Sequence, residues 1–172
     1  AGGSNTVEER RGELVGKIGE NIQVTRVTQL GLDSDGVVGT YVHHNGKLGV
    51  LTAVQSGGSA DVLNQFAKGV CLTAAAYGTD YLHADEVPAE AVEKERAFVM
   101  EQTRESMQGK PDEIVAKAAE GRMRKFFEEK TLVAQAWVPD SSLTVEMARE
   151  AAAKEVGSDV AIHSFKRVEL GV

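Results

Sequence analysis

The sequence predicts an α+β fold, in which helices pack on one face of a small antiparallel sheet and a helical hairpin protrudes from it. Three observations predict this class. Two segments of alternating polarity flank Asn45-Gly46, apolar residues recur at helical spacing after about residue 60, and Gly109-Lys110-Pro111 divides a long charged region, 88–129. A period of two is typical of half-buried strands, whereas a spacing of three to four residues is typical of helices.

The N-terminal part of the chain predicts one helix and one strand. The helix is expected from about Val7 to Lys17, because Thr6 can serve as its N-cap and Gly19 as its C-terminal stop. The alternation that follows over residues 22–27 predicts a half-buried strand.

A β-hairpin is expected next. The segments 37–42 and 48–54 alternate, and Asn45-Gly46 between them is typical of a type I′ turn, in which both central residues have positive φ. A last alternating segment, 160–170, predicts a third strand.

The remaining elements are predicted to be helices. One runs from about Ala60 to Ala75 after Ser59 as a cap, and another follows Ser141 or Ser142 and ends near Val156-Gly157. Two more, Pro88–Met107 and Pro111–Glu129, form the hairpin, since Pro favours a helix start and Gly a helix end. The hairpin carries ten acidic and eight basic residues and only thin apolar stripes, so it is expected to protrude. Those stripes are Val92, Phe98 and Val99 on the first helix and Val115, Ala119 and Phe126 on the second.

A short internal repeat suggests how the chain is divided. The helix–Gly–strand pattern of residues 17–27 recurs in residues 155–165, which is typical of two copies of one design. We therefore expect four parts. They are a linker or tag (1–6), the last helix and strand of a first core subdomain (7–30), a second core subdomain (31–87 and 130–172) and the helical hairpin (88–129).

Composition excludes several classes of function. The net charge is −7 over 172 residues, and the one local basic cluster lies between glutamates, so direct nucleic-acid binding is disfavoured. No apolar run approaches the ~20 residues of a membrane span. Cys71 is the single cysteine and lies in an apolar run, where a buried side chain is expected.

Neither a metal site nor a catalytic site is predicted. His43 and His44 are neighbours, but adjacent strand residues point to opposite faces and no third ligand is apparent. No nucleophile elbow, phosphate-binding Gly loop or HExxH pattern occurs, so no catalytic residue and no cofactor is expected.

Three motifs in series resemble the elongation factor Ts family. Residues 17–22 (KIGENI) resemble one signature of that family, and residues 39–51 resemble its GxYxH…GVLV hairpin. Residues 109–126 resemble its GKP…EGRxxKF run at the tip and return arm of a coiled-coil hairpin. The resemblance extends from about Val7 to Gly171 and implies a fold like the core of that family.

The resemblance implies a function and a set of contact residues. Members of the family bind elongation factor Tu in its GDP-bound and nucleotide-free states and speed the release of GDP, without covalent chemistry. Ile18, Gly19 and His43 match positions that contact this partner. Lys110, Arg122 and Lys125 match the arm, which is either a partner-docking element or a solvated helix face. The compartment implied is the bacterial cytoplasm, the plastid stroma or the mitochondrial matrix.

The chain departs from the family pattern in two places. The N-terminal helical module with its TGAG signature and the CxTDF motif, whose aromatic residue is the wedge of the family, are both absent. We expect a natural truncated form or one segment of a longer polypeptide, with reduced exchange activity. The alternative is an interaction module that docks on elongation factor Tu or on the ribosome without exchange.

Overall fold

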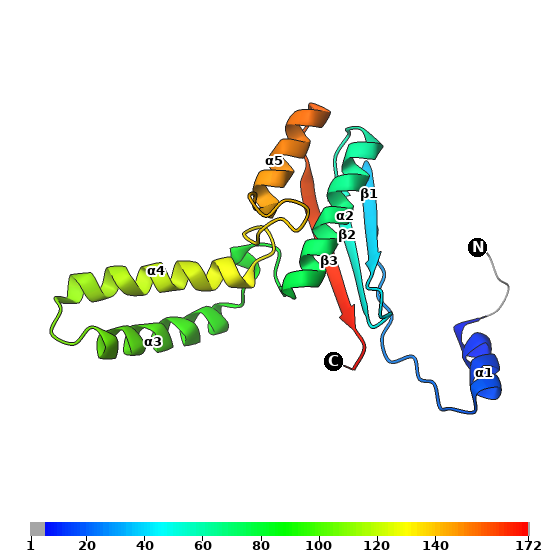
Figure 1. The fold of residues 1–172 in the computed structure, drawn as a ribbon, viewed down its shortest axis with the longest axis horizontal. Coiled ribbons are helices and arrows are strands. Elements are labelled where there is room, and N and C mark those ends of the chain that lie inside the picture. The colour runs from blue at the N-terminus through cyan, green and yellow to red at the C-terminus, as the bar shows by residue number, and fades with distance from the viewer. Residues whose placement is uncertain (1–5, 172) are drawn as a thin grey trace.

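The computed structural model describes residues 6–171, and within this range it confirms the α+β class (Figure 1). The elements in chain order are α1 (Val7–Ile18), β1 (Gly36–Val42), β2 (Leu48–Gln55), α2 (Ala60–Tyr77), the 3₁₀ helix η1 (Ala84–Glu86), α3 (Ala89–Ser106), α4 (Asp112–Lys130), α5 (Val145–Val156) and β3 (Ala161–Glu169). Apart from Thr6, the expected linker 1–6 lies outside the described residues. No helix within 6–171 is long and apolar enough to cross a bilayer.

The sheet is antiparallel, with the strand order β1-β2-β3. Val37 pairs with Val54 between β1 and β2, and Leu51 pairs with Lys166 between β2 and β3. Helices α2 and α5 lie on one face of the sheet, as expected (Figure 1). All three strands begin and end within one residue of the predicted limits.

The main core lies between this face of the sheet and α2. Val50 and Val54 of β2 meet Leu63, Phe66 and other apolar residues of α2, all of them nearly inaccessible to solvent. Cys71 is fully buried there, as predicted, and its Sγ donates to Thr52 Oγ1 over 3.2 Å. Burial raises the pKa of the Cys71 thiol, so the group is kept as an inert core side chain.

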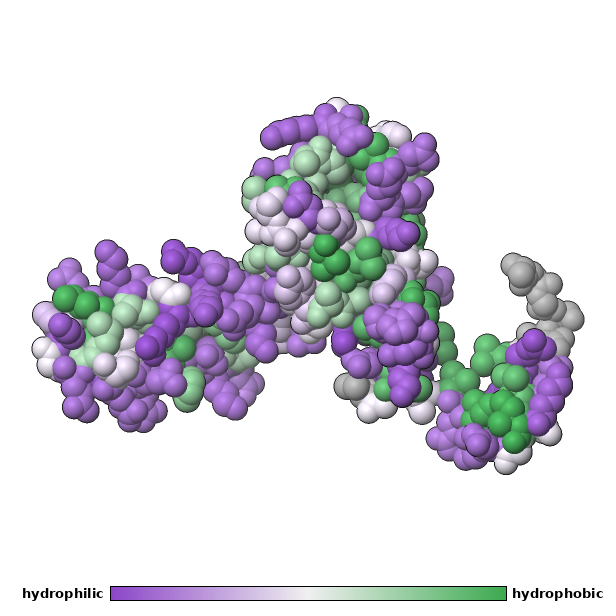
Figure 2. Space-filling model, in the orientation of Figure 1, coloured by the Kyte–Doolittle hydropathy of each residue, from purple (hydrophilic) through white to green (hydrophobic). Residues whose placement is uncertain are grey.

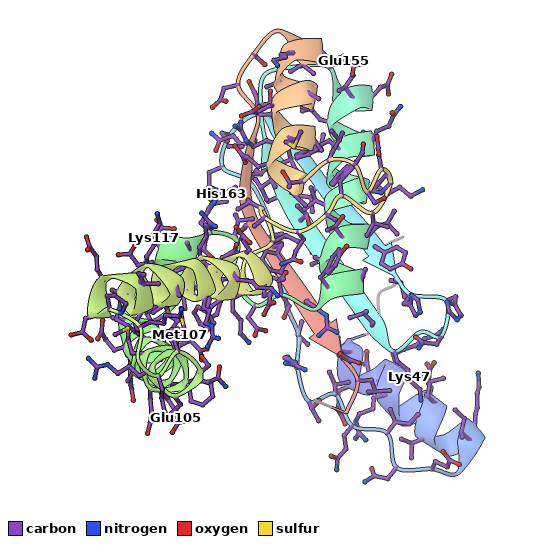
Figure 3. All side chains as sticks on the ribbon, turned by 60° about the vertical axis from the view of Figure 1, so that its left-hand side comes forward. Lys47, Glu105, Met107, Lys117, Glu155 and His163 are labelled. Atoms are coloured by element: carbon purple, nitrogen blue, oxygen red, sulfur yellow. The ribbon has the colours of Figure 1, made fainter. Side chains whose placement is uncertain are left out.

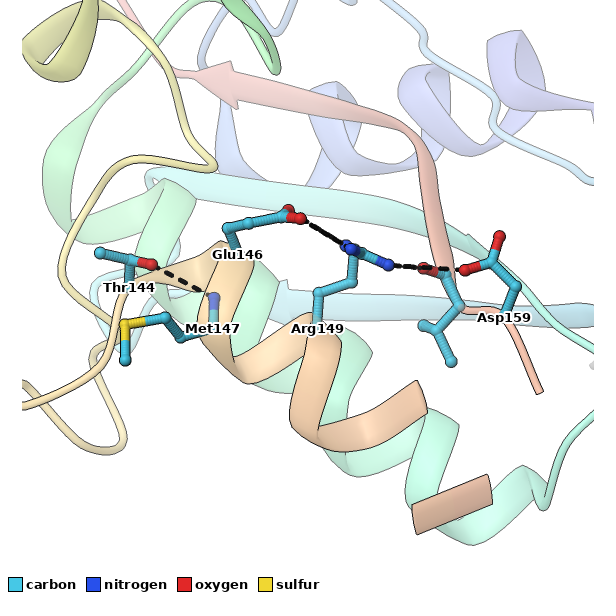
Figure 4. A network of polar contacts seen from close by, with 6 residues as sticks. Thr144, Glu146, Met147, Arg149 and Asp159 are labelled. Atoms are coloured by element: carbon cyan, nitrogen blue, oxygen red, sulfur yellow. Dashed lines mark hydrogen bonds and ion pairs between the residues drawn. The ribbon is translucent and has the colours of Figure 1, made fainter. Parts of the chain in front are cut away.

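A polar network attaches α5 to the beginning of β3 (Figure 4). The Arg149 guanidinium donates to Glu146 Oε1 over 2.7 Å and to the carbonyl of Val160 over 2.9 Å, and it lies 3.6 Å from Asp159. The hydrogen bond from Arg149 lowers the pKa of Glu146. The network therefore sets the angle at which the chain passes from α5 into the sheet.

Helix caps agree with the sequence at one site and differ at two others. Thr6 caps α1 in a reciprocal capping box with Glu9. Ser59 holds the N-cap position of α2, but its side chain makes no capping hydrogen bond. The predicted cap of α5, Ser141 or Ser142, is wrong: Thr144 accepts from the Met147 N–H, and the Ser142 hydroxyl donates to Asp140 instead. The Ser142 N–H also donates to Asp140 Oδ1, so Ser142 belongs to a turn around Asp140 that precedes the helix.

The β1–β2 turn differs from the predicted type I′ turn. The Gly46 N–H donates to the His43 carbonyl over 2.8 Å, which makes His44 and Asn45 the central residues of the turn. Among the described residues only glycines have positive φ, and Gly46 has φ 69°. The Asn45 side chain accepts from the Lys47 N–H instead, which stabilises a longer turn in which Gly46 alone takes the left-handed conformation.

The predicted strand over residues 22–27 is wrong. Residues 19–35 form no helix or strand, and Val24 and Val27 are 50% and 80% exposed. An alternating segment becomes a strand only when a neighbouring strand takes up its backbone N–H and C=O groups. No strand of the described sheet pairs with this segment.

The predicted helical hairpin is confirmed by α3 and α4, which extend away from the sheet as an arm (Figure 1). The buried residues on its seam are Val99, Thr103, Val115, Ala119 and Met123. The prediction that Phe98 belongs to the apolar stripe between the two helices is wrong, because this residue is 55% exposed. In Figure 2 the visible face of the arm is mostly hydrophilic, with apolar residues exposed among the polar ones.

Candidate functional site

The C-terminal end of α1 presents the first pair of predicted contact residues. Ile18 is the last residue of the helix and is 57% exposed. Gly19 caps the helix with φ 76°, and its N–H donates to the Val15 carbonyl over 2.9 Å. A residue with a Cβ is strained at this φ, so Gly19 both ends α1 and leaves Ile18 uncovered. Figure 2 shows apolar residues gathered on the visible face of α1.

Arg11 holds the loop that follows α1. Its guanidinium donates to the Ile22 carbonyl over 3.0 Å and also pairs with Glu8 in the preceding turn. The Arg11 hydrogen bond lowers the pKa of Glu8, and the same bond raises the pKa of Arg11. Arg11 therefore holds the chain after Gly19 against α1, and the sequence analysis did not single out this residue.

The β1–β2 turn presents the third predicted residue, His43. It follows β1 directly, is half-buried, and its Nδ1 lies 2.9 Å from the Tyr41 hydroxyl. Tyr41 belongs to β1 and His43 follows the strand, and their contact places the two side chains on the same side of the hairpin. The spacing of two residues is the signal in the sequence that could have identified Tyr41 as a neighbour of His43.

A groove joins the segment after α1 to this turn. Its volume is about 450 Å³, and it is lined by residues 23–26 on one side and by the hairpin and the end of β3 on the other. The Arg26 guanidinium donates to the Glu169 carbonyl across it over 3.3 Å. The segment that follows Ile18 and Gly19 therefore lies against the hairpin that carries His43, at one end of the sheet. Figure 3 shows Lys47 of the hairpin on the side of α1, and Met107 on the arm away from it.

The predicted arm residues take different positions. Lys110 is exposed at the tip, next to Gly109 with φ 80°. Lys125 is 75% exposed and lies 3.9 Å from Glu129 on its own helix. Arg122 instead reaches across to α3, where it donates to Gln102 Oε1 over 3.2 Å and to Ser106 Oγ over 3.4 Å. Lys110 and Lys125 are therefore available to a partner, whereas Arg122 also joins the two helices of the arm.

The two histidines do not point apart, so this expectation was wrong. Their ring centroids are 4.2 Å apart, because β1 ends at Val42 and the alternation of side chains ends with it. A pair of imidazoles still lacks the further ligands of a structural zinc site. Within residues 6–171, no three His, Cys, Asp or Glu side chains come close enough together to hold a metal ion.

These features define a class of protein: a two-layer α+β body with a helical arm that extends away from its sheet. The family model for elongation factor TS matches residues 1–172. The chain is also similar to proteins named elongation factor Ts, with 44% identity over 171 residues to that of Brucella anthropi and 43% over 164 residues to that of Allorhizobium ampelinum. This chain belongs to the elongation factor Ts family.

The matches cover most of this chain but only part of its relatives. The alignments include 96% of the chain and 55% of the Brucella anthropi protein, and 92% and 52% for Allorhizobium ampelinum. A third relative, from Brucella ovis, is 42% identical with the same coverage as the first. The chain thus spans about half the length of the curated relatives it matches.

Proposed function

We propose that this chain binds elongation factor Tu, in its GDP-bound and nucleotide-free states, and promotes the release of GDP. The observation that carries the proposal is the match of one elongation factor family over the whole chain. The exposed Ile18 and the half-buried His43 at one end of the sheet support it. We propose further that the chain does no covalent chemistry and acts in the bacterial cytoplasm or in an organelle, and the bacterial relatives favour the former.

The proposed contact surface consists of two regions. Ile18, Gly19 and His43 form the first, which we call the sheet-end region. Lys110 and Lys125 on the arm form the second, the arm region, with Arg122 maintaining the arm itself. A partner that contacts both regions gains affinity from the fixed distance between them, because the second contact then costs little further entropy.

Titration of elongation factor Tu·GDP with this chain tests binding. We expect a saturable complex, and no detectable binding at ~100 μM, equivalent to about −5.5 kcal/mol, would contradict the proposal. Tyr41→Phe keeps the ring but removes the hydroxyl that lies 2.9 Å from His43 Nδ1. This variant is expected to weaken binding less than His43→Ala does, because the imidazole remains in place.

Exchange activity is proposed to be weak. Exchange requires tighter binding to the empty GTPase than to its GDP form, and by linkage the same factor weakens GDP binding. The CxTDF wedge of the family is absent from this sequence. We therefore expect less than about tenfold acceleration of GDP release, or ~1.4 kcal/mol of barrier.

Stopped-flow release of a fluorescent GDP analogue, with and without excess chain, measures this acceleration. A hundredfold increase would show that the wedge is dispensable. A second candidate function, docking on elongation factor Tu or on the ribosome without exchange, is favoured by the same missing motif. This alternative predicts a saturable complex in the titration and no acceleration of GDP release in the stopped-flow assay.

A further inference from the structure

The direction of the arm is not determined by packing between helices. α3 and α4 pack chiefly against each other, and no described helix or strand of the body packs extensively on either. One side of the arm base is hollow, with a volume of about 520 Å³. Residues lining this hollow include Ala84, Arg96, Met123, Phe127, Val133 and Ala134. The helices of the arm therefore contribute little to its angle, and the attachment lies in the segments at its base, where Leu82 and Leu132 are buried in the main core.

Gln135 provides polar attachment at this base. Its side chain is buried, with 8% of the residue exposed. The amide Nε2 donates to the carbonyls of Glu128, Glu129 and Thr131, over 2.7, 3.2 and 3.0 Å. These carbonyls belong to the C-terminal end of α4, where backbone acceptors have no partner within the helix. Gln135 thus acts as the C-terminal cap of the arm from outside the arm.

The backbone of Gln135 is held by the body. Its N–H donates to the Leu132 carbonyl over 3.1 Å, and its carbonyl accepts from the Val145 N–H over 3.0 Å, at the start of α5. Leu132 and Val145 are both fully buried in the main core. One residue therefore connects the last turn of the arm to the first turn of a helix that packs on α2.

We propose that Gln135 is a positioning residue that fixes the arm relative to the sheet and its β1–β2 turn, and so holds the arm region and His43 in one rigid surface. This inference rests on the proposed function, because it concerns how that surface is held together. Without the amide donors, the part-buried carbonyls of Glu128 and Glu129 and the buried carbonyl of Thr131 lose this partner and gain by moving toward water. The arm then pivots about its remaining backbone links, and the two regions bind with a lower effective concentration.

The experiment uses the full chain with spin labels at Gln108→Cys, beside the arm tip, and Asn64→Cys on α2. Both positions are exposed, whereas the native Cys71 is buried and escapes labelling. In the parent chain a narrow distribution of distances between the labels is expected. Gln135→Met has a similar length and no donor, and is expected to broaden that distribution, while Gln65→Met, at an exposed position of α2, leaves it narrow. An unchanged distribution in Gln135→Met would overturn the proposal.

Binding to elongation factor Tu·GDP gives a readout that a purely structural role would not produce. Gln135→Met is expected to weaken binding at least about fivefold in the parent chain, but less than about twofold in a Lys110→Ala/Lys125→Ala background, where the arm contacts are already lost. Equal weakening in both backgrounds would overturn the proposal.

Two further outcomes are distinguishable. If the parent chain does not bind elongation factor Tu, the proposed function fails, and the label distances alone decide the role of Gln135. If Gln135→Met does not fold, as judged by circular dichroism, Gln135→Asn replaces it, since it keeps the amide on a side chain shorter by one methylene. An intermediate broadening is expected for that variant, and a distribution as narrow as that of the parent would overturn the proposal.

Discussion

The indole ring of Trp137 lies directly on Gly69 of α2. A Cβ placed on Gly69 would lie 2.2 Å from two carbon atoms of that ring. Trp137 is also stacked on Phe66, with ring centroids 5.5 Å apart. The loop between α4 and α5 is thus anchored on α2 by one aromatic residue, at a point where only glycine leaves room.

Gly69→Ala is therefore expected to destabilise the protein, although alanine favours helix formation more than glycine. Helix propensity contributes up to ~1 kcal/mol in favour of alanine, but overpacking of a core costs roughly 1–3 kcal/mol. The free energy of unfolding in urea measures the balance. Gly121→Ala in α4 is the matched control, since its Cβ would meet no atom within 4 Å, and it should not lower stability. A Gly69→Ala variant as stable as the parent would show that Trp137 moves freely.

Thr6→Ala is expected to loosen α1 without unfolding the body. None of the 12 residues of α1 is buried, so this short helix depends on local interactions, of which an N-cap contributes about 1 kcal/mol. Amide hydrogen exchange of residues 9–18 should become faster. Ser59→Ala should leave the exchange of α2 unchanged, because Ser59 makes no side-chain capping bond. Faster exchange in both helices, or in neither, would contradict this view of the caps.

The Glu146–Arg149 pair should make stability depend on pH in the acidic range. The hydrogen bond from Arg149 holds the pKa of Glu146 below its ordinary value of 4.5. The contribution of the pair is therefore present at neutral pH and is lost as pH falls below about 4.5 through the lowered pKa. The Glu146 side chain is 43% exposed, so solvent screening limits this contribution to at most about 1 kcal/mol.

Urea unfolding at pH 7 and at pH 3 measures the effect. Glu146→Gln should lower stability at pH 7 and have a smaller effect at pH 3, because the contribution of the lowered pKa declines once the pH is below the ordinary value of 4.5. Glu155→Gln, at an exposed position near the end of the same helix, should cause no loss at either pH. A loss from Glu146→Gln that is equal at both pH values would show that the charge of Glu146 is irrelevant.

Added Zn²⁺ is expected to leave the melting temperature unchanged. His43 and His44 lie side by side, but a structural zinc ion takes four ligands, and these two offer half of that number. A specific ligand would stabilise the folded state by mass action. Thermal melts with Zn²⁺ and with EDTA, repeated on His44→Ala, provide the test. A stoichiometric rise that His44→Ala abolishes would establish a site at the turn.

The sequence alone predicted most helices and strands, because their signals are local. Periods of two and of three to four residues placed all three strands of the sheet and the main helices within about two residues of their observed ends. Glycine and proline marked the arm, since their effects on φ and on hydrogen bonding act within one turn. The family motifs were also local, and the prediction that Ile18, Gly19 and His43 contact a partner rests on them.

Only the tertiary structure decided which of these local tendencies were realised. Residues 22–27 alternate like a strand but find no pairing partner in the described sheet. His43 and His44 lie together because β1 ends at Val42, so neither histidine belongs to the strand. Gln135 carries no pattern in the sequence, and its role arises because folding brings it against the C-terminal carbonyls of α4. A backbone group can be satisfied by any donor within about 3 Å, and only the folded chain determines which donor that is.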